Sequence, residues 1–228
     1  MMPSIALIGP DGAGKTTITR MLEESGLIPF KYLYMGIDIQ ASNVALPSAR
    51  WIERLKSAQG RRSEPGAALA RHTKTHPRRG RVRALFRLGY RLADEWFRQA
   101  VSWSYQARGY AVLHDRHFVF DFAPEIAGRH APLDKRMHGW CLRLYPRPTL
   151  VIFLDAPGAL LFARKGESTV EELERRRQGF LQLARQTPGL ITVDASRPLP
   201  VVYADVAGHV TRLCAQQRGA CRTAGVPS

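Results

Sequence analysis

The sequence predicts an α/β fold: a five-stranded parallel sheet with helices on both of its faces. Two observations lead to this prediction. Five short apolar runs alternate with helical segments along the chain, which is the pattern of parallel sheets. The run Leu150–Asp155 is apolar at successive positions, as expected of a strand buried on both faces. At 228 residues the chain suits a single domain, which we place at residues 1–217, followed by a frayed tail at 218–228.

The elements follow from hydrophobic periodicity and from turn residues. We expect strands at Ser4–Ile8, Lys31–Met35, Ala111–Asp115, Leu150–Asp155 and Leu190–Asp194. We expect helices at Lys15–Glu24, Ala49–Ala58, Val82–Ala107, Pro132–Tyr145, Leu160–Ala163, Thr169–Gln186 and Pro198–Ala215. Ser168 and Thr169 each precede a glutamate by three residues, which predicts a capping box at the start of the sixth helix.

The link between the first strand and the first helix is rich in glycine. It reads Gly9-Pro10-Asp11-Gly12-Ala13-Gly14-Lys15-Thr16 and fits the pattern G-x-x-x-x-G-K-[ST] of phosphate-binding loops. Glycines let the backbone N–H groups surround a polyphosphate, and the positive end of the following helix attracts negative charge. Lys15 is expected to hold the β- and γ-phosphates and Thr16 to bind Mg²⁺. The simpler alternative is a chance glycine-rich turn before a helix.

The net charge is strongly positive and unevenly distributed. The formal charge is +15, and about two thirds of it lies between Arg50 and Arg98. This excess indicates an anionic partner. Phosphorylated substrates are sufficient to explain it, although nucleic acid or an acidic membrane surface is also compatible. Residues 38–81 form a basic, breaker-rich insertion, and so long a loop is usually functional or disordered.

The helix expected at Val82–Ala107 has two contrasting faces. An apolar stripe is formed by Val82, Leu85, Gly89, Leu92, Ala93, Trp96, Ala100 and Trp103. The opposite face carries Arg87, Arg91, Asp94 and Arg98. One interpretation is a solvated face with internal ion pairs. The other is a site at which Arg91 and Arg98 bind the phosphate of an acceptor.

Charged residues also follow or accompany the apolar elements further along the chain. Asp115 and Arg116 lie at the carboxyl end of the third strand, the end at which open parallel sheets bind ligands. The acid can orient Mg²⁺ and the arginine can bind a phosphate. Arg177 falls on the apolar stripe of its helix, where it needs a partner. A carboxylate, the transferring phosphate or a snorkelling side chain each satisfies that need.

Composition favours a cytoplasmic protein. No apolar run approaches the roughly 18 residues that span a bilayer. Met1-Met2-Pro3 leads directly into the first strand, so we expect no signal peptide. The three cysteines have no metal-ligand spacing, which favours reduced thiols.

With these motifs in place, the chain resembles the thymidylate kinase branch of P-loop nucleoside monophosphate kinases, and the resemblance covers nearly the whole chain. It rests on four stretches: Gly9–Thr17, Asp115-Arg116-His117, Leu154-Asp155-Ala156-Pro157 with Arg164, and Val193-Asp194-Ala195 with Pro198-Leu199. Residues 174–181 also resemble the family's helix after the lid. The resemblance implies the P-loop NTPase fold with a short lid at about 164–169.

The resemblance also implies roles for individual residues on the donor side. Lys15 and Thr16 match the phosphate lysine and the Mg²⁺ hydroxyl, and Ala195 matches the loop that packs against adenine. The implied nucleotide-binding residues are Gly9, Asp11, Gly12, Ala13, Gly14, Lys15, Thr16, Thr17, Arg164 and Ala195. Ala13 stands where some family members have a catalytic arginine. The transition-state arginine is therefore expected at Arg164, with Lys165 as a helper.

On the acceptor side, the resemblance implies that Asp11 recognises a sugar hydroxyl and that Arg116 binds the acceptor phosphate. The implied catalytic set is Lys15, Asp115, Arg116, Arg164 and Arg177, with Thr16 and Asp115 as the Mg²⁺ ligands. Tyr34-Met35-Gly36-Ile37 replaces the family's proline-glycine-glycine stretch.

The expected activity is ATP-dependent phosphoryl transfer to a nucleoside monophosphate or a similar phosphorylated small acceptor. One alternative is a kinase of a non-nucleotide metabolite with a diverged acceptor pocket. Another is a nucleotide-switched protein that binds nucleic acid or an acidic membrane through residues 50–98. A simple ATPase or GTPase switch suits Asp115 and Arg116 less well. We also consider a homodimer.

Overall fold

A computed structural model of the chain describes residues 1–35, 77–121 and 144–223. Its five strands are β1 (Ser4–Ile8), β2 (Phe30–Tyr34), β3 (Ala111–Asp115), β4 (Leu150–Asp155) and β5 (Leu190–Asp194). They form one sheet in the order β2-β3-β1-β4-β5, and every neighbouring pair is parallel. The prediction of a five-stranded parallel sheet is therefore confirmed. Only β2 differs, because it begins and ends one residue earlier than expected.

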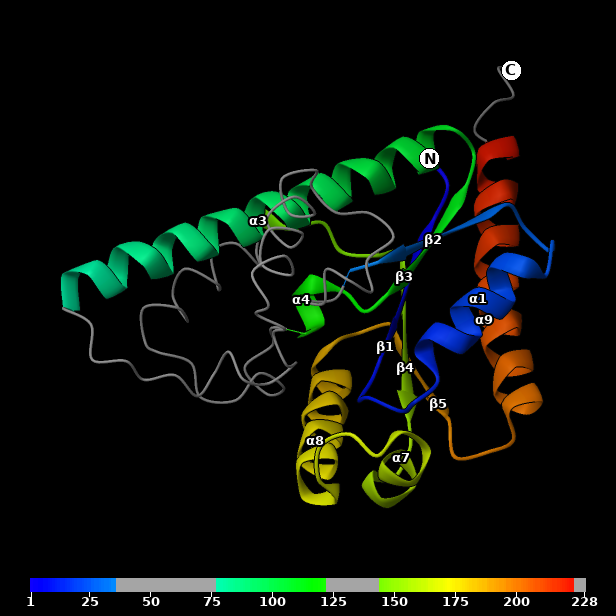
Figure 1. Ribbon diagram of the computed structural model, residues 1–228. Coiled ribbons are helices and arrows are strands. Elements are labelled where there is room, and N and C mark those ends of the chain that lie inside the picture. The colour runs from blue at the N-terminus through cyan, green and yellow to red at the C-terminus, as the bar shows by residue number, and fades with distance from the viewer. Residues whose placement is uncertain (36–76, 122–143, 224–228) are drawn as a thin grey trace.

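Helices cover both faces of the sheet (Figure 1). On one face lie α1 (Lys15–Glu24) and α9 (Leu199–Thr223), which contact each other. On the other lie α3 (Pro77–Ala107), α4 (Phe118–Asp121) and α8 (Val170–Gln186). The short helix α7 (Gly158–Lys165) packs against α8 beyond the end of β4.

The alternation of side chains along β1 explains why the sheet needs this double cover. Ile5 and Leu7 pack into a core with α1 and α9, whereas Ala6 and Ile8 pack into a second core with α4 and α8. A third cluster joins β2 and β3 to α3 through Leu33, which is fully buried. Since both faces of the central strands are buried, their sequences are mostly apolar, with the exceptions near the strand ends.

Helices α1, α3, α7, α8 and α9 were predicted and differ from the prediction only at their ends, whereas the short α4 was not predicted. Thr169 rather than Ser168 caps α8, because the Thr169 hydroxyl accepts a hydrogen bond from the Glu172 N–H at 3.2 Å. α3 begins at Pro77, so the last residues of the predicted loop are helical. α9 extends to Thr223, into the predicted tail. The predicted helix at Ala49–Ala58 and nearly all of that at Pro132–Tyr145 lie outside the described residues.

The burial of α3 runs against its apolar pattern. Trp96 and Trp103, on the apolar stripe, are each 39% exposed. The side chains of Asp94 and Arg98, on the face that one interpretation described as solvated, are buried, and Arg98 is only 1% exposed. Tertiary packing overrides the apolar pattern here, because the polar face meets polar groups that β3 and Tyr145 present.

Those polar groups satisfy one another in a buried layer. Arg98 forms ion pairs with Asp94 and Glu95. The Tyr145 hydroxyl donates to the Glu95 carbonyl at 3.1 Å. Ser102 Oγ accepts from the Gln106 amide at 3.0 Å and lies 3.4 Å from His114 Nε2. These contacts replace water and so lower the cost of burying the polar face, while His114 Nδ1 has no hydrogen-bond partner in the described part of the chain.

Among the described helices, none combines the length and apolarity that crossing a membrane requires.

Two buried histidines make the fold sensitive to mild acid. Burial lowers the pKa of His114 from its ordinary value of 6.5 to about 3, and burial followed by the nearby His114 lowers the pKa of His117. The unfolded chain binds protons at these residues near pH 6.5, whereas the folded chain does not. The stability that they contribute is therefore present above pH 6.5 and is lost as the pH falls.

We predict that the free energy of unfolding falls by about 2 kcal/mol per buried histidine between pH 7 and pH 5. His114→Gln should reduce this pH dependence by about that amount, because the unfolded variant has one fewer proton to bind. Denaturant unfolding at a series of pH values, without added metal, measures the effect. His209→Gln, at a partly exposed position on α9, is the control and should leave the pH dependence unchanged. A pH dependence that His114→Gln does not reduce would contradict the prediction.

Candidate functional site

The glycine-rich loop between β1 and α1 adopts a backbone that only glycine accommodates well. Gly9, Gly12 and Gly14 have φ values of 147°, 87° and 88°. A Cβ atom on Gly9 would lie 2.7 Å from the Leu154 carbonyl oxygen, and one on Gly12 would lie 2.8 Å from the Leu161 carbonyl oxygen. The loop therefore packs its backbone directly against the ends of β4 and α7.

Lys15 is the first residue of α1, and its side chain turns back over the loop. The Lys15 ammonium donates to the carbonyl oxygens of Gly9 at 2.9 Å and Pro10 at 2.7 Å. Its side chain is buried, while the following Thr16 and Thr17 are exposed at the start of the helix. The loop thus places a cation and the amino end of a helix side by side, which is the arrangement that binds phosphate.

Asp115, at the carboxyl end of β3, is fully buried and accepts two hydroxyl hydrogen bonds on one oxygen. Thr16 Oγ1 donates to Asp115 Oδ2 at 2.5 Å, and the Tyr32 hydroxyl donates to the same oxygen at 3.0 Å. The other oxygen, Oδ1, is buried without a hydrogen-bond partner among the described residues. Sequence analysis missed Tyr32, because only the pairing of β2 with β3 brings it to Asp115.

Asp11, in the middle of the glycine loop, pairs with two arginines. Arg116 Nη2 binds Asp11 Oδ1, and Arg176 Nη1 lies 3.1 Å from Asp11 Oδ2. Burial alone would raise the pKa of Asp11, but Arg116, Lys15 and Arg176 outweigh it and lower the pKa to about 2. Asp11 is therefore ionised at neutral pH and joins the loop, β3 and α8 electrostatically.

Arg116 itself has an unusual backbone conformation. Its φ is 70°, in the left-handed region that non-glycine residues rarely adopt. Its N–H donates to the Leu7 carbonyl at 3.1 Å, which anchors the strained residue to the end of β1. Strain of this kind concentrates at functional sites, where the surrounding structure holds it in place.

Arg176 was missed by the sequence analysis, and Arg177 was selected instead. Arg177 Nε and Nη2 donate to the two carboxylate oxygens of Asp155 at 2.6 and 3.0 Å, and Nη1 lies 2.9 Å from Glu174 Oε1. Of the three partners considered for Arg177, the structure supplies the carboxylate. These contacts raise the pKa of Arg177 and tie α8 to the end of β4. The Arg175-Arg176-Arg177 run indicated an arginine-rich segment, but the apolar pattern drew attention to Arg177, whereas the structure brings Arg176 to Asp11.

Arg164 contacts the loop after β5. Its Nη1 donates to the Ala195 carbonyl at 2.9 Å, and the Ala195 N–H donates to the Asp155 carbonyl at 2.7 Å. The neighbouring Lys165 is exposed and pairs with Glu167 at 2.9 Å. Arg164, which was expected at the transition state, therefore contacts Ala195, which was expected to pack against adenine.

Two arginines of α3 were predicted to bind an acceptor phosphate. One of them, Arg98, is buried and forms ion pairs with Asp94 and Glu95. The side chain of Arg91 lies outside the described residues. The contacts of Arg98 match the ion-pair interpretation, although on a buried face rather than a solvated one.

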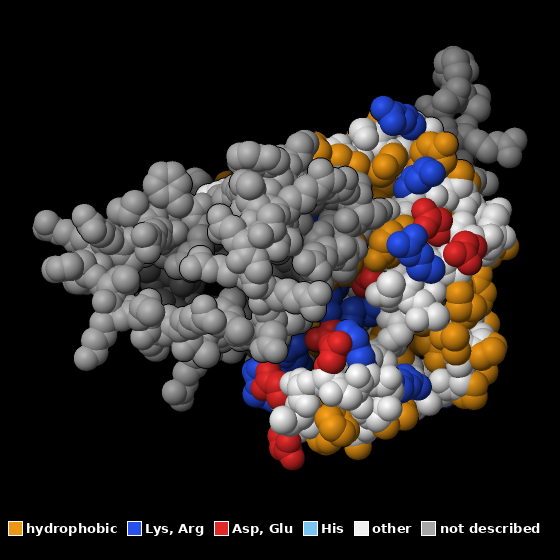
Figure 2. All heavy atoms as spheres, in the orientation of Figure 1, with side chains coloured by type: hydrophobic (Ala, Val, Ile, Leu, Met, Phe, Trp, Pro, Cys, Tyr) orange, Lys and Arg blue, Asp and Glu red, His pale blue; other side chains and the backbone are white. Residues whose placement is uncertain are grey.

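Charge at the site is mixed rather than uniformly basic. On the face shown in Figure 2, acidic and basic side chains lie intermingled near α7 and α8.

Within the described ranges, no group of three or more His, Cys, Asp or Glu side chains is placed to hold a metal ion. Thr16 and Asp115 still fit Mg²⁺, because this ion commonly takes one or two protein ligands and completes its shell with water and phosphate oxygens. The buried Asp115 Oδ1 is the acceptor that such an ion or its water would use.

Together, the five-stranded parallel sheet and the helices on both of its faces define a protein of the α/β class. Comparison with known proteins narrows this class. The chain is 31% identical over 123 residues to the thymidylate kinase of Shewanella frigidimarina (strain NCIMB 400), a match that covers 48% of this chain and 57% of that protein.

The thymidylate kinase of Shewanella sp. (strain ANA-3) is 30% identical over 110 residues, which cover 44% of this chain and 52% of that protein. The chain thus spans about half the length of the curated relatives it matches. No protein-family model matches it. The two matches support a thymidylate kinase-like relationship.

The close packing of the glycine loop can be tested at Gly12. We predict that Gly12→Ala lowers the free energy of unfolding by clearly more than the roughly 1–2 kcal/mol that a left-handed alanine costs, because its Cβ would also meet the Leu161 carbonyl. Gly26→Ala is the matched control, since Gly26 has a φ of 68° with nothing within 4 Å of the added Cβ. Denaturant unfolding of both variants measures the difference. Equal losses would show that the loop does not pack as described.

Proposed function

We propose that this protein is an ATP-dependent phosphotransferase that moves the γ-phosphoryl group of ATP to a nucleoside monophosphate or a similar phosphorylated small acceptor. The single observation that carries the proposal is the convergence of Lys15, Thr16, Asp115 and Arg116 at the carboxyl end of the sheet. The thymidylate kinase-like relationship supports the same kind of activity.

The donor triphosphate would lie along the glycine loop. In this proposal the backbone N–H groups from Gly9 to Thr17 surround the phosphates, and the Lys15 ammonium exchanges its bonds to the loop carbonyls for bonds to phosphate oxygens. Thr16 and Asp115 would hold Mg²⁺, which supplies charge neutralisation on the phosphates when bound. The role of the protein is to position two anions and to stabilise the charge that develops between them.

In this proposal two arginines act on phosphate. Arg116 and Arg176 both contact Asp11, which belongs to the loop itself. We assign Arg116 to the acceptor phosphate and Arg176 to the transferring phosphoryl group. Asp11 would hold both guanidinium groups over the loop and accept a hydrogen bond from an acceptor hydroxyl.

The two arginines selected from sequence receive different roles in this proposal. The bond from Arg164 to the Ala195 carbonyl favours a place at the edge of the donor base rather than at the transition state. The bidentate pair of Arg177 with Asp155 favours a brace that fixes α8 against β4. The catalytic roles first expected for Arg164 and Arg177 stay predictions that their contacts do not favour.

The proposed activity predicts ATP consumption that depends on an acceptor and on Lys15. With Mg²⁺ present, we expect at least one compound in a panel of nucleoside monophosphates and phosphorylated sugars to stimulate ADP release. Lys15→Ala should abolish the stimulation, because the phosphate cation is lost. A coupled assay for ADP measures the rate, and analysis of the phosphorylated product identifies the acceptor.

The panel separates the competing functions. Stimulation only by a phosphorylated sugar would indicate the non-nucleotide kinase. Absence of any stimulation, together with nucleic-acid or vesicle binding that weakens steeply between 50 and 200 mM salt, would favour the nucleotide-switched alternative. Absence of ATP binding would contradict the kinase functions and the nucleotide-switched alternative alike.

The assignment of Arg176 gives a second prediction. Arg176→Ala should lower kcat by about 100-fold while changing the KM for ATP by less than about threefold, because an arginine acting on the transferring group stabilises mainly the transition state. Arg175→Ala is the matched control: Arg175 and Arg176 are neighbours on α8 and pair with the same Glu172, at 2.6 and 3.2 Å, while the pair with Asp11 belongs to Arg176. Its kcat should stay within about twofold of the wild-type value. Equal effects of the two substitutions would refute the assignment.

A further inference from the structure

Tyr32 lies in the middle of β2 and reaches the acid at the end of the neighbouring strand. In the β2–β3 register Tyr32 is opposite Leu113 and Tyr34 is opposite Asp115, so the long Tyr32 side chain extends past its own partner. Its hydroxyl donates to Asp115 Oδ2 at 3.0 Å, and both side chains are buried. A phenylalanine would fill the same core space without this bond.

Helix α1 holds Tyr32 in place from the other side. The guanidinium carbon of Arg20 lies 4.0 Å from the centre of the Tyr32 ring, a cation–π contact. Glu23 Oε1 accepts the Tyr32 N–H at 3.0 Å, and Arg20 and Glu23 lie 3.6 Å apart. The helix that begins with Lys15 and Thr16 therefore also orients the tyrosine that contacts Asp115.

These contacts fix the orientation of the Asp115 carboxylate. Thr16 and Tyr32 donate to the same oxygen, Oδ2, from two different elements, so rotation of the carboxylate would break two hydrogen bonds. The second oxygen, Oδ1, is buried and has no hydrogen-bond partner in the described part of the chain. A buried carboxylate oxygen without a hydrogen-bond partner lowers the stability of the fold, so Oδ1 of Asp115 points to a ligand that binds there.

We propose that Tyr32 is a positioning residue that holds the Asp115 carboxylate so that Oδ1 stays available to Mg²⁺ or to a water bound to Mg²⁺. The inference rests on the proposed function, which places metal and nucleotide at Thr16 and Asp115.

The test is Tyr32→Phe, with metal binding measured directly. Mn²⁺ serves as the probe for the metal site, and its binding in the presence of a non-hydrolysable ATP analogue is followed by electron paramagnetic resonance or calorimetry. We expect the affinity for Mn²⁺ to fall about five- to tenfold, as for loss of a hydrogen bond to a charged group. Binding of the analogue without metal should change by less than about twofold, because the proposal gives Tyr32 a role only through Asp115.

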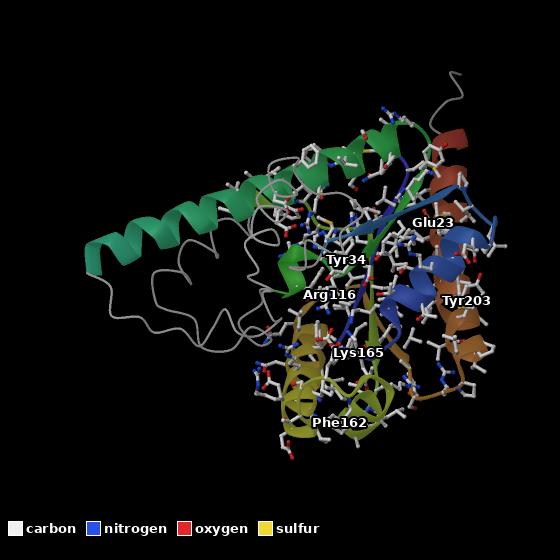
Figure 3. The ribbon with its side chains drawn as sticks, in the orientation of Figure 1. Glu23, Tyr34, Arg116, Phe162, Lys165 and Tyr203 are labelled. Atoms are coloured by element: carbon white, nitrogen blue, oxygen red, sulfur yellow. The ribbon has the colours of Figure 1, made fainter. Side chains whose placement is uncertain are left out.

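Three further variants separate positioning from packing. Tyr145→Phe removes another buried hydroxyl bond, the one to the Glu95 carbonyl at 3.1 Å, and should leave the affinity for Mn²⁺ unchanged. Arg20→Leu removes the cation over the Tyr32 ring without touching Asp115, and should weaken Mn²⁺ binding about two- to threefold. Tyr203→Phe on α9, which lies well away from Arg116 in Figure 3, is a remote control.

Each outcome decides the proposal. Wild-type affinity for Mn²⁺ in Tyr32→Phe would overturn it, even if the variant were less stable, because Tyr32 would then be a core residue only. If the wild-type protein bound no metal–nucleotide complex, the proposed function would fail and the positioning role with it. If the wild type bound the complex but phosphorylated no acceptor, the Mn²⁺ measurement would still decide the role of Tyr32.

Discussion

The contact between the glycine loop and the ends of β4 and α7 is the constraint on which the rest of the site depends. Gly9 and Gly12 bring the backbone so close to the Leu154 and Leu161 carbonyls that a side chain cannot be inserted. Because the loop is held there, α1 starts directly behind it and projects Lys15 over the loop and Thr16 toward β3. The order β2-β3-β1-β4-β5 places β3 beside β1, and this neighbour supplies Asp115 and Arg116.

Carboxylates organise the arginines around this loop. Asp11 holds Arg116 and Arg176, while Asp155 holds Arg177. The two groups differ in what they join: the Asp11 pairs connect the loop to β3 and α8, and the Asp155 pair fixes α8 to the end of β4. An ionised Asp11 keeps two guanidinium groups close to the loop. If these groups exchanged Asp11 for phosphate oxygens, the cost would be small, because the old and the new contacts are both charge-assisted hydrogen bonds.

Polar contacts also hold elements together inside the core, between α3 and β3. Asp94, Arg98, Ser102 and His114 form a buried layer between α3 and β3, directly behind the strand that ends in Asp115. In such a layer hydrogen-bond geometry sets the position of each group, whereas apolar contacts tolerate sliding. Trp96 and Trp103 are consequently left on the outer side of α3.

The sequence by itself determined the five strands, the helices next to them and the glycine loop, because these features depend on local periodicity and on backbone conformations that only glycine adopts. It also predicted Lys15, Thr16, Asp115 and Arg116 as site residues, because they lie at strand or helix ends where their types are informative. Only the tertiary structure decided that α3 buries its polar face, that Arg176 rather than Arg177 reaches Asp11, and that Tyr32 meets Asp115. Each of these depends on which groups a neighbouring element presents, and a helical or strand repeat carries no information about its neighbour.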